Sequence, residues 1–163
     1  MKQRILFPLL LALLLPLLSA CGGGGTPAAD HSPEDLAAAI QGARDAEENQ
    51  VFPILTTFED EYIFSLLSLS EADVSACAVS VSPMNVRAYG IALVVPAEGK
   101  ADTVLAGLQG FIDLQQQNFE HYLPDQYDIA KNAVLETFPN GTILLAMCQD
   151  SGSVAANIRA ALQ

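Results

Sequence analysis

Apolar residues recur along this chain with two different periods, and these periods predict its secondary structure. Ser32-Pro33 suits the cap and first turn of a helix, and apolar positions then follow a helical period to about Glu47. Aromatic and aliphatic residues predict a short second helix from about Glu59 to Leu67. Alternation from Val74 to Val81, and again from Arg87 to Val95, predicts two strands that form a hairpin.

The second half of the chain predicts a long helix, a second hairpin and a last helix. Lys100 to Tyr122 has the periodicity of one long helix, and Asn132 to Phe138 predicts a third strand. Asn140-Gly141 is a strong hairpin turn signal, so Thr142 to Cys148 is expected to pair with the third strand. Asp150-Ser151 then caps a last helix. The order predicts an α+β fold, a small antiparallel four-stranded sheet of two hairpins with helices packed on one face.

The N-terminal segment has a different pattern, which predicts a signal peptide at residues 1–20. Lys2 and Arg4 supply positive charge, and Ile5 to Leu18 is almost wholly apolar. That run is shorter than the roughly 20 residues of a membrane-spanning helix. Small residues end it, and charge, apolar run and small residues in this order are typical of a cleaved secretory signal.

The tract Leu18-Ser19-Ala20-Cys21 resembles a lipobox. The resemblance implies cleavage after Ala20 and attachment of a diacylglyceryl group, with acyl chains such as palmitate, to the thiol of Cys21. The protein would then be anchored in the cell membrane, on its extracytoplasmic face. A Gly-rich tether at residues 21–32 would follow, and residues 33–163 would form a single α+β domain.

Charge limits the partners of this domain. The chain has a net charge of −12, and removal of the leader with Lys2 and Arg4 makes it −14. Such a surface is repelled by phosphate backbones and anionic headgroups, so no nucleic-acid partner is expected. Lipid, rather than a basic patch, would hold the domain to the membrane.

Two cysteines remain besides Cys21. Cys77 and Cys148 both lie in apolar strand-like runs, where cysteine behaves as a small buried hydrophobe. Outside the cytoplasm such a pair can also form a disulfide. Buried thiols are favoured here, and the disulfide stays open as the alternative because sequence does not give the separation of the two residues.

Few residues in the sequence are candidates for catalysis or metal binding. Glu59-Asp60-Glu61, with Glu47-Glu48 nearby, is the densest acid cluster, but it lacks the alternating ligands and the turn glycine of a calcium loop. A solvated helix start or loop explains it better. His31 and His121 have no zinc-ligand spacing, and Ser151-Gly152-Ser153 is better explained as a helix start than as a nucleophile elbow. We therefore expect no catalytic residue, metal or cofactor.

Two tyrosines near the predicted end of the long helix offer a small aromatic surface for a ligand. Tyr122 and Tyr127 flank the turn at Pro124. Core packing of one and exposure of the other is the simpler interpretation.

Several short, weakly specific motifs in the second half of the chain resemble those of a known family. Phe119 to Pro124, then Asn132 to Val134 and Gly141 to Leu145, resemble the domain-of-unknown-function family DUF4358. The resemblance covers Asp73 to Leu162 and implies a lipoprotein of the type found in anaerobic Gram-positive bacteria, with this fold. It implies no activity.

The sequence thus favours a lipid-anchored, non-enzymatic binding or accessory module at the cell envelope. Its expected partner is an envelope protein or a wall polymer. The alternatives are an envelope hydrolase that uses acids from Glu47 to Glu61, and a lipoprotein that binds a small ligand.

Overall fold

The computed structural model describes residues 31–163 of the chain. Its elements in order are α1 (Pro33–Ala43), α2 (Ala46–Val51), α3 (Glu61–Leu66), a 3-10 turn η1 (Glu71–Asp73), β1 (Val74–Val81), β2 (Gly90–Pro96), α4 (Ala101–Phe119), α5 (Pro124–Lys131), β3 (Val134–Thr137), β4 (Ile143–Met147) and α6 (Ser151–Ala161). The predicted signal peptide, its cleavage residues, Cys21 and most of the tether lie outside the described residues. Within residues 31–163, no helix is both long and apolar enough to cross a membrane.

The four strands form one antiparallel sheet in the order β1-β2-β4-β3. Each hairpin pairs its own strands, and β2 pairs with β4 to join them, with Ala92 opposite Leu145. The apolar alternation predicts the strands because successive side chains point to opposite faces of a sheet. The α+β class and the four-stranded sheet of two hairpins are confirmed.

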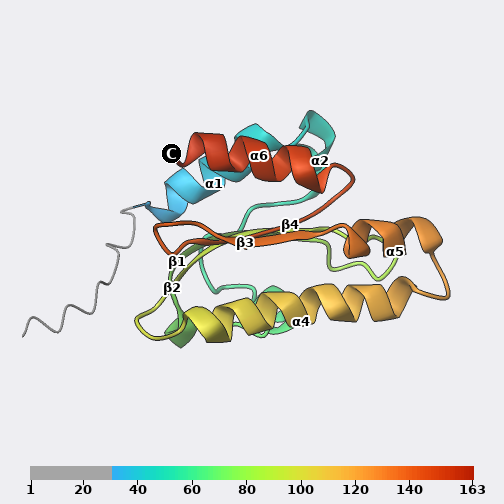
Figure 1. Cartoon of the computed structure of the whole chain (residues 1–163), viewed down its shortest axis with the longest axis horizontal. Coiled ribbons are helices and arrows are strands. Elements are labelled where there is room, and N and C mark those ends of the chain that lie inside the picture. Colours follow the sequence, from blue (N-terminus) through green and yellow to red (C-terminus); the bar gives the residue numbers. More distant parts are fainter. Residues whose placement is uncertain (1–30) are drawn as a thin grey trace, which may run out of the picture.

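Helices cover both faces of this sheet, which corrects the expectation of a single covered face (Figure 1). α1 and α6 pack on one face, and α4 packs on the other. The central strand β2 explains why, since Ile91 and Leu93 enter one core while Ala92 and Val94 enter the other. A strand that is apolar on both sides is stable only when both sides are shielded from water.

The first predicted helix is two helices in the structure. α1 ends at Ala43, and Asp45 then caps α2 by accepting a hydrogen bond from the backbone N–H of Glu48 at 2.8 Å. The carboxylate of Glu48 in turn accepts a hydrogen bond from the backbone N–H of Asp45, which completes a capping box. The prediction of one helix to Glu47 was wrong because the apolar period continues across this local start signal.

An unpredicted helix, α5, lies between the long helix and the second hairpin. α4 ends at Phe119, and Pro124 occupies the first turn of α5 rather than only ending α4. The third strand consequently starts at Val134, later than predicted.

The second strand also starts later than predicted, at Gly90 instead of Arg87. The backbone N–H of Ala88 donates to the side chain of Gln126 in α5 at 2.9 Å, so it is unavailable to a strand partner. Gly90 is the first residue of the ladder and lies against Phe111, where an added Cβ would come within 2.8 Å of the ring.

Both remaining cysteines are free and buried, as favoured from the sequence. Cys77 belongs to the core beneath α4, and Cys148 belongs to the core beneath α1 and α6. Because the sheet separates the two cores, the structure gives no support to the disulfide alternative. Burial raises the pKa of each thiol to about 11, so both are poor nucleophiles at neutral pH.

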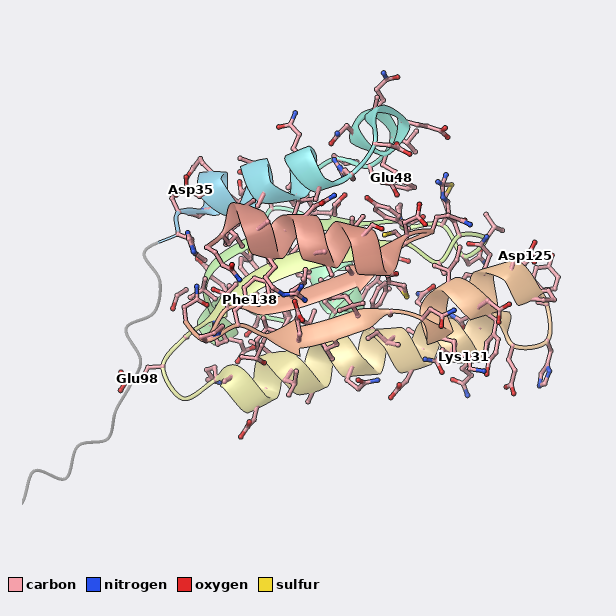
Figure 2. All side chains as sticks on the ribbon, turned by 45° about the horizontal axis from the view of Figure 1, so that its top comes forward. Asp35, Glu48, Glu98, Asp125, Lys131 and Phe138 are labelled. Atoms are coloured by element: carbon pink, nitrogen blue, oxygen red, sulfur yellow. The ribbon has the colours of Figure 1, made fainter. Side chains whose placement is uncertain are left out.

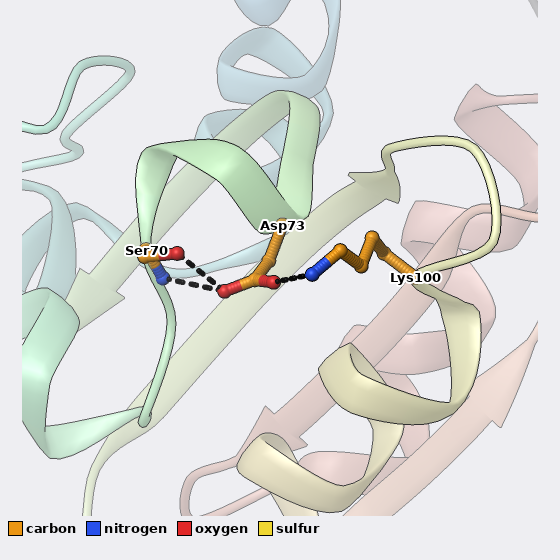
Figure 3. A network of polar contacts seen from close by, with 3 residues as sticks. All are labelled: Ser70, Asp73 and Lys100. Atoms are coloured by element: carbon orange, nitrogen blue, oxygen red, sulfur yellow. Dashed lines mark hydrogen bonds and ion pairs between the residues drawn. The ribbon is translucent and has the colours of Figure 1, made fainter.

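A polar network fastens the sheet to the start of α4 (Figure 3). The carboxylate of Asp73 accepts hydrogen bonds from the hydroxyl and backbone N–H of Ser70 and from the ammonium of Lys100, the last at 2.9 Å. These contacts, led by the Ser70 hydroxyl, lower the pKa of Asp73 to about 2. Asp73 therefore links η1 to the helix that follows β2.

The variant Asp73→Asn is expected to melt at a lower temperature than the native chain at pH 7. A carboxyl with a depressed pKa stabilises the fold above its ordinary pKa of 3.8, and that stabilisation is lost as the pH falls toward 2. The difference in melting temperature should therefore shrink between pH 5 and pH 2. Circular dichroism melts across that range measure it, and a difference that does not change with pH would contradict the assignment.

Candidate functional site

Some of the residues that the sequence analysis singled out lie in the described part of the structure, and others do not. The predicted lipidation and cleavage residues, Cys21 with Leu18, Ser19 and Ala20, lie outside the described part of the chain. His121 is exposed beyond the end of α4, and its nearest acid is Glu120 at 3.7 Å. Among the described residues, no group of three or more histidine, cysteine or acidic side chains is arranged to hold a metal ion.

The two tyrosines separate as predicted. Tyr122 is 73% exposed, whereas Tyr127 packs against the core beneath α4. Lys131 lies over the ring of Tyr127 at 5.9 Å. The two rings therefore have different environments and do not form one ligand surface.

The acid cluster does not form a convergent carboxylate site. Asp60 caps α3 by accepting from the N–H of Ile63, and Glu59 and Glu61 beside it are exposed. Glu48 takes part in the capping box of α2, where burial raises its pKa. The interpretation as a solvated helix start is confirmed for Glu59, Asp60 and Glu61 at α3, whereas Glu48 is half-buried at the start of α2.

Exposed apolar side chains gather around one hollow beside these acids. Seven large apolar side chains are exposed among residues 31–163, and three of them, Val51, Tyr62 and Met84, line a single groove of about 250 Å³. Buried or half-buried residues, among them Phe52, Leu55, Ile63 and Val81, form the rest of its apolar side-chain lining together with two exposed prolines, and the exposed Asp60 also lines it. We call this hollow the α2–α3 groove, since α2 ends in one wall and α3 forms the other.

An aromatic stack supports the α2 wall of the groove. The ring of Phe52 lies on that of Tyr89, with centroids 4.0 Å apart and planes 15° apart. The guanidinium of Arg87 lies over Phe52 at 4.9 Å. The Phe52 ring is therefore held in position by its contacts with both Tyr89 and Arg87.

Beneath this stack lies Arg44, a buried cation that is only 8% exposed. Its guanidinium donates to the Phe52 carbonyl at 2.7 Å, to the Ser80 hydroxyl at 2.7 Å, to the Tyr89 hydroxyl at 3.2 Å and to the Asn49 side chain at 2.6 Å. One side chain therefore ties α2 to β1 and to the start of β2. Burial raises the pKa of Tyr89 to about 12, so its hydroxyl is neutral at physiological pH.

Sequence reasoning missed both the groove and Arg44. The partners of Arg44 lie up to 45 residues away along the chain, so no local pattern marks them. The one available signal was a single basic residue between an apolar helical stripe and the capping Asp45, in a chain with very few basic residues.

A second hollow is polar and open. It is a cleft of about 650 Å³ between α5 and the start of α6, lined by polar residues that include Asp125, Asp128, Asn132 and Asp150. The buried Ser151 in the first turn of α6 already bonds the backbone of Cys148, accepting from its N–H and donating to its carbonyl. Ser151 therefore serves the local turn. The cap expected from Asp150-Ser151 is not made, because Asp150 occupies the N-cap position of α6 without a side-chain cap bond.

The α2–α3 groove and the polar cleft lie away from the point where the described chain begins. α1 starts at that point and α2 follows at its other end, about 16 Å further on for an 11-residue helix (Figure 1). Figure 2 shows Asp35 and Glu98 at the first end, and Glu48 and Asp125 toward the other. The two candidate surfaces thus belong to the end of the domain remote from residue 31.

Comparison with known proteins places the chain in a family but gives no activity. No curated protein matches the sequence. No solved structure matches it either. Residues 53–148, more than half of the chain, match a family, and this segment includes the sheet, α3, α4 and α5. The chain therefore belongs to the family described as Domain of unknown function (DUF4358).

Proposed function

We propose that this chain is a lipoprotein of the cell envelope whose domain is a non-enzymatic module that binds another envelope component. Lipid on Cys21 would anchor it at the extracytoplasmic face of the membrane. The observation that carries the binding role is the gathering of Val51, Tyr62 and Met84 around one groove at the end remote from residue 31. Exposed apolar side chains that cluster on a soluble domain typically mark an interaction site.

The position of the groove suits an anchored protein. A tether of about 12 residues spans on the order of 20 Å on average, so it would keep the start of α1 near the membrane. The groove would then face away from that surface, toward other components of the envelope. The net charge of −14 without the leader supports the same orientation, because anionic headgroups repel such a domain.

Of the two alternative functions, the structure disfavours the hydrolase and gives some support to binding of a small ligand. A hydrolase built on Glu47 to Glu61 would need carboxylates that face one pocket, whereas Glu48 and Asp60 are used as helix caps. The polar cleft between α5 and α6 favours the second candidate, a lipoprotein that binds a small polar ligand, because its volume is in the range of about 300–1,000 Å³ that such ligands occupy.

Lipidation of Cys21 is tested by labelling the full chain with a fatty acid in a cell that makes lipoproteins. Cys21→Ala should abolish the label and release the chain from the membrane fraction, because the only acceptor thiol for the diacylglyceryl group is removed. Cys77→Ala is the matched control, since it removes a thiol buried in the core. Label that persists in Cys21→Ala, or a native chain that takes up none, would refute the anchor.

A further inference from the structure

The α2–α3 groove has the size of a socket for a side chain rather than a site for a whole small molecule. Its volume of about 250 Å³ lies below the roughly 300–1,000 Å³ of sites for drug-sized ligands. Three of its lining side chains, Val51, Tyr62 and Met84, are 46%, 57% and 48% exposed. Pockets of this kind receive the apolar anchor residues that dominate protein–protein binding energies.

The groove is held open before any partner arrives. The guanidinium of Arg44 fixes the Phe52 carbonyl, and the Phe52 ring is stacked on Tyr89. On the opposite wall, Ile63 is buried in the core, which anchors α3. A preformed socket costs little conformational entropy on binding.

One acid lines this apolar floor, and three more lie close to lining residues in the sequence. Asp60 lines the groove, with Glu59 and Glu61 beside it and Glu47 on α2, and all four are exposed. The basic side chains nearby are already engaged, since Arg44 is buried in its network and Arg87 lies on the Phe52 ring. The groove therefore presents an apolar centre with a negative rim at Asp60, on its α3 side.

Strand addition does not suit this edge of the sheet. Leu55 exchanges both backbone hydrogen bonds with Val79 on the outer edge of β1, at 2.7 and 2.8 Å. Pro53, which lines the groove two residues earlier, has no N–H to donate. Contact at the groove thus depends on side chains.

We propose that the α2–α3 groove docks a segment of a partner protein that inserts one or two apolar side chains and carries lysine or arginine beside them. The inference rests on the proposed function, since it names the partner of that binding module. Charge complementarity selects this occupant. A second copy of the chain would bring the same acids, an anionic membrane would be repelled, and a polar wall glycan would leave the apolar floor without a match.

Site-specific photo-crosslinking in the full chain, made in its own cells, tests the proposal. A benzoylphenylalanine replaces Tyr62 or Met84, and a third chain carries it at Leu105, a matched exposed residue of α4 away from the groove. Both groove positions should link to the same partner protein, at a yield about tenfold above that from Leu105. The linked peptide should contain an apolar residue with lysine or arginine within a few positions.

A charge variant tests the rim separately. Glu59→Gln combined with Glu61→Gln, placed in the chain with the photoprobe at Tyr62, should lower the yield about threefold or more and reduce its dependence on salt. Glu98→Gln is the matched control, because it removes an exposed acid at the end of the domain remote from the groove, and it should leave the yield unchanged. An unchanged yield in the Glu59 and Glu61 variant would overturn the basic character of the partner.

Other adducts would overturn the proposal. These are a dimer of the chain, a lipid or glycan adduct, or equal labelling from Leu105. General formaldehyde crosslinking of the same cells distinguishes failure of the groove from failure of the proposed function. A partner fixed by formaldehyde but not by the groove probes would refute only the groove, whereas no partner by either method would refute the binding module.

Discussion

Replacing Arg44 with leucine is expected to destabilise the folded domain strongly. The substitution leaves the Phe52 carbonyl and the hydroxyls of Ser80 and Tyr89 without their donor in a buried site. Each buried polar group left unpartnered costs about 1–3 kcal/mol, and Ser80 and Phe52 can still bond each other, so we expect a total of about 3–5 kcal/mol. Urea denaturation followed by circular dichroism measures the loss.

Two further arginine variants separate this network from a general effect of charge. Arg44→Lys keeps the charge and most of the stem but loses the planar fork that reaches several acceptors at once, so its stability should lie between native and Arg44→Leu. Arg159→Leu removes a partly exposed ion pair with Glu136 and should cost less than about 1 kcal/mol. Equal unfolding midpoints for native and Arg44→Leu chains would show that the network contributes nothing.

The network also links stability to the proposed binding surface. Arg44 fixes the backbone of Phe52, which forms part of the floor of the α2–α3 groove. The Arg44→Lys variant is expected to remain folded, but the backbone at Phe52 should be held less firmly. The shape of the groove therefore depends on contacts between residues far apart in the sequence, such as those of Arg44 with Ser80 and Tyr89, and not on its lining residues alone.

Local patterns were sufficient for the presence of all four strands, for the bounds of β1 and for one hairpin turn. Val74 to Val81 alternates between two kinds of side chain, and the structure gives β1 the same bounds. Asn140-Gly141 places the second hairpin because glycine adopts the positive φ of 89° that this turn has at Gly141. In these segments the sequence signal and the backbone requirement coincide.

The covering of the second sheet face was not predictable in the same way. Alternation shows that both faces of β2 are apolar, but it does not say which distant helix covers each face. The family match does not identify the helices of this face either, because the matched residues 53–148 include neither α1 nor α2 and none of α6. The helices on one face of the sheet therefore lie outside the matched segment, although Leu36 and Ile158 on them are fully buried.

Gly107→Ala is expected to destabilise the domain although alanine is the better helix former. Gly107 lies within α4, where it meets the chain at the end of α3, and an added Cβ would stand 2.5 Å from the carbonyl oxygen of Leu67. That oxygen is backbone and cannot turn aside, so α4 must move away from the core. Overpacking of this kind costs about 1–3 kcal/mol, which exceeds the helix-propensity gain of about 1 kcal/mol.

Gly110→Ala, one turn further along α4, is the matched control and should change stability in the opposite direction. A Cβ at Gly110 meets nothing within 4 Å, so only the propensity gain remains and we expect stabilisation of about 0.5–1 kcal/mol. Urea midpoints of the two variants should therefore lie on opposite sides of the native value. If both variants were stabilised, α3 and α4 would not be in contact at Gly107. The wall of the groove that α3 forms would then lack its support from the long helix.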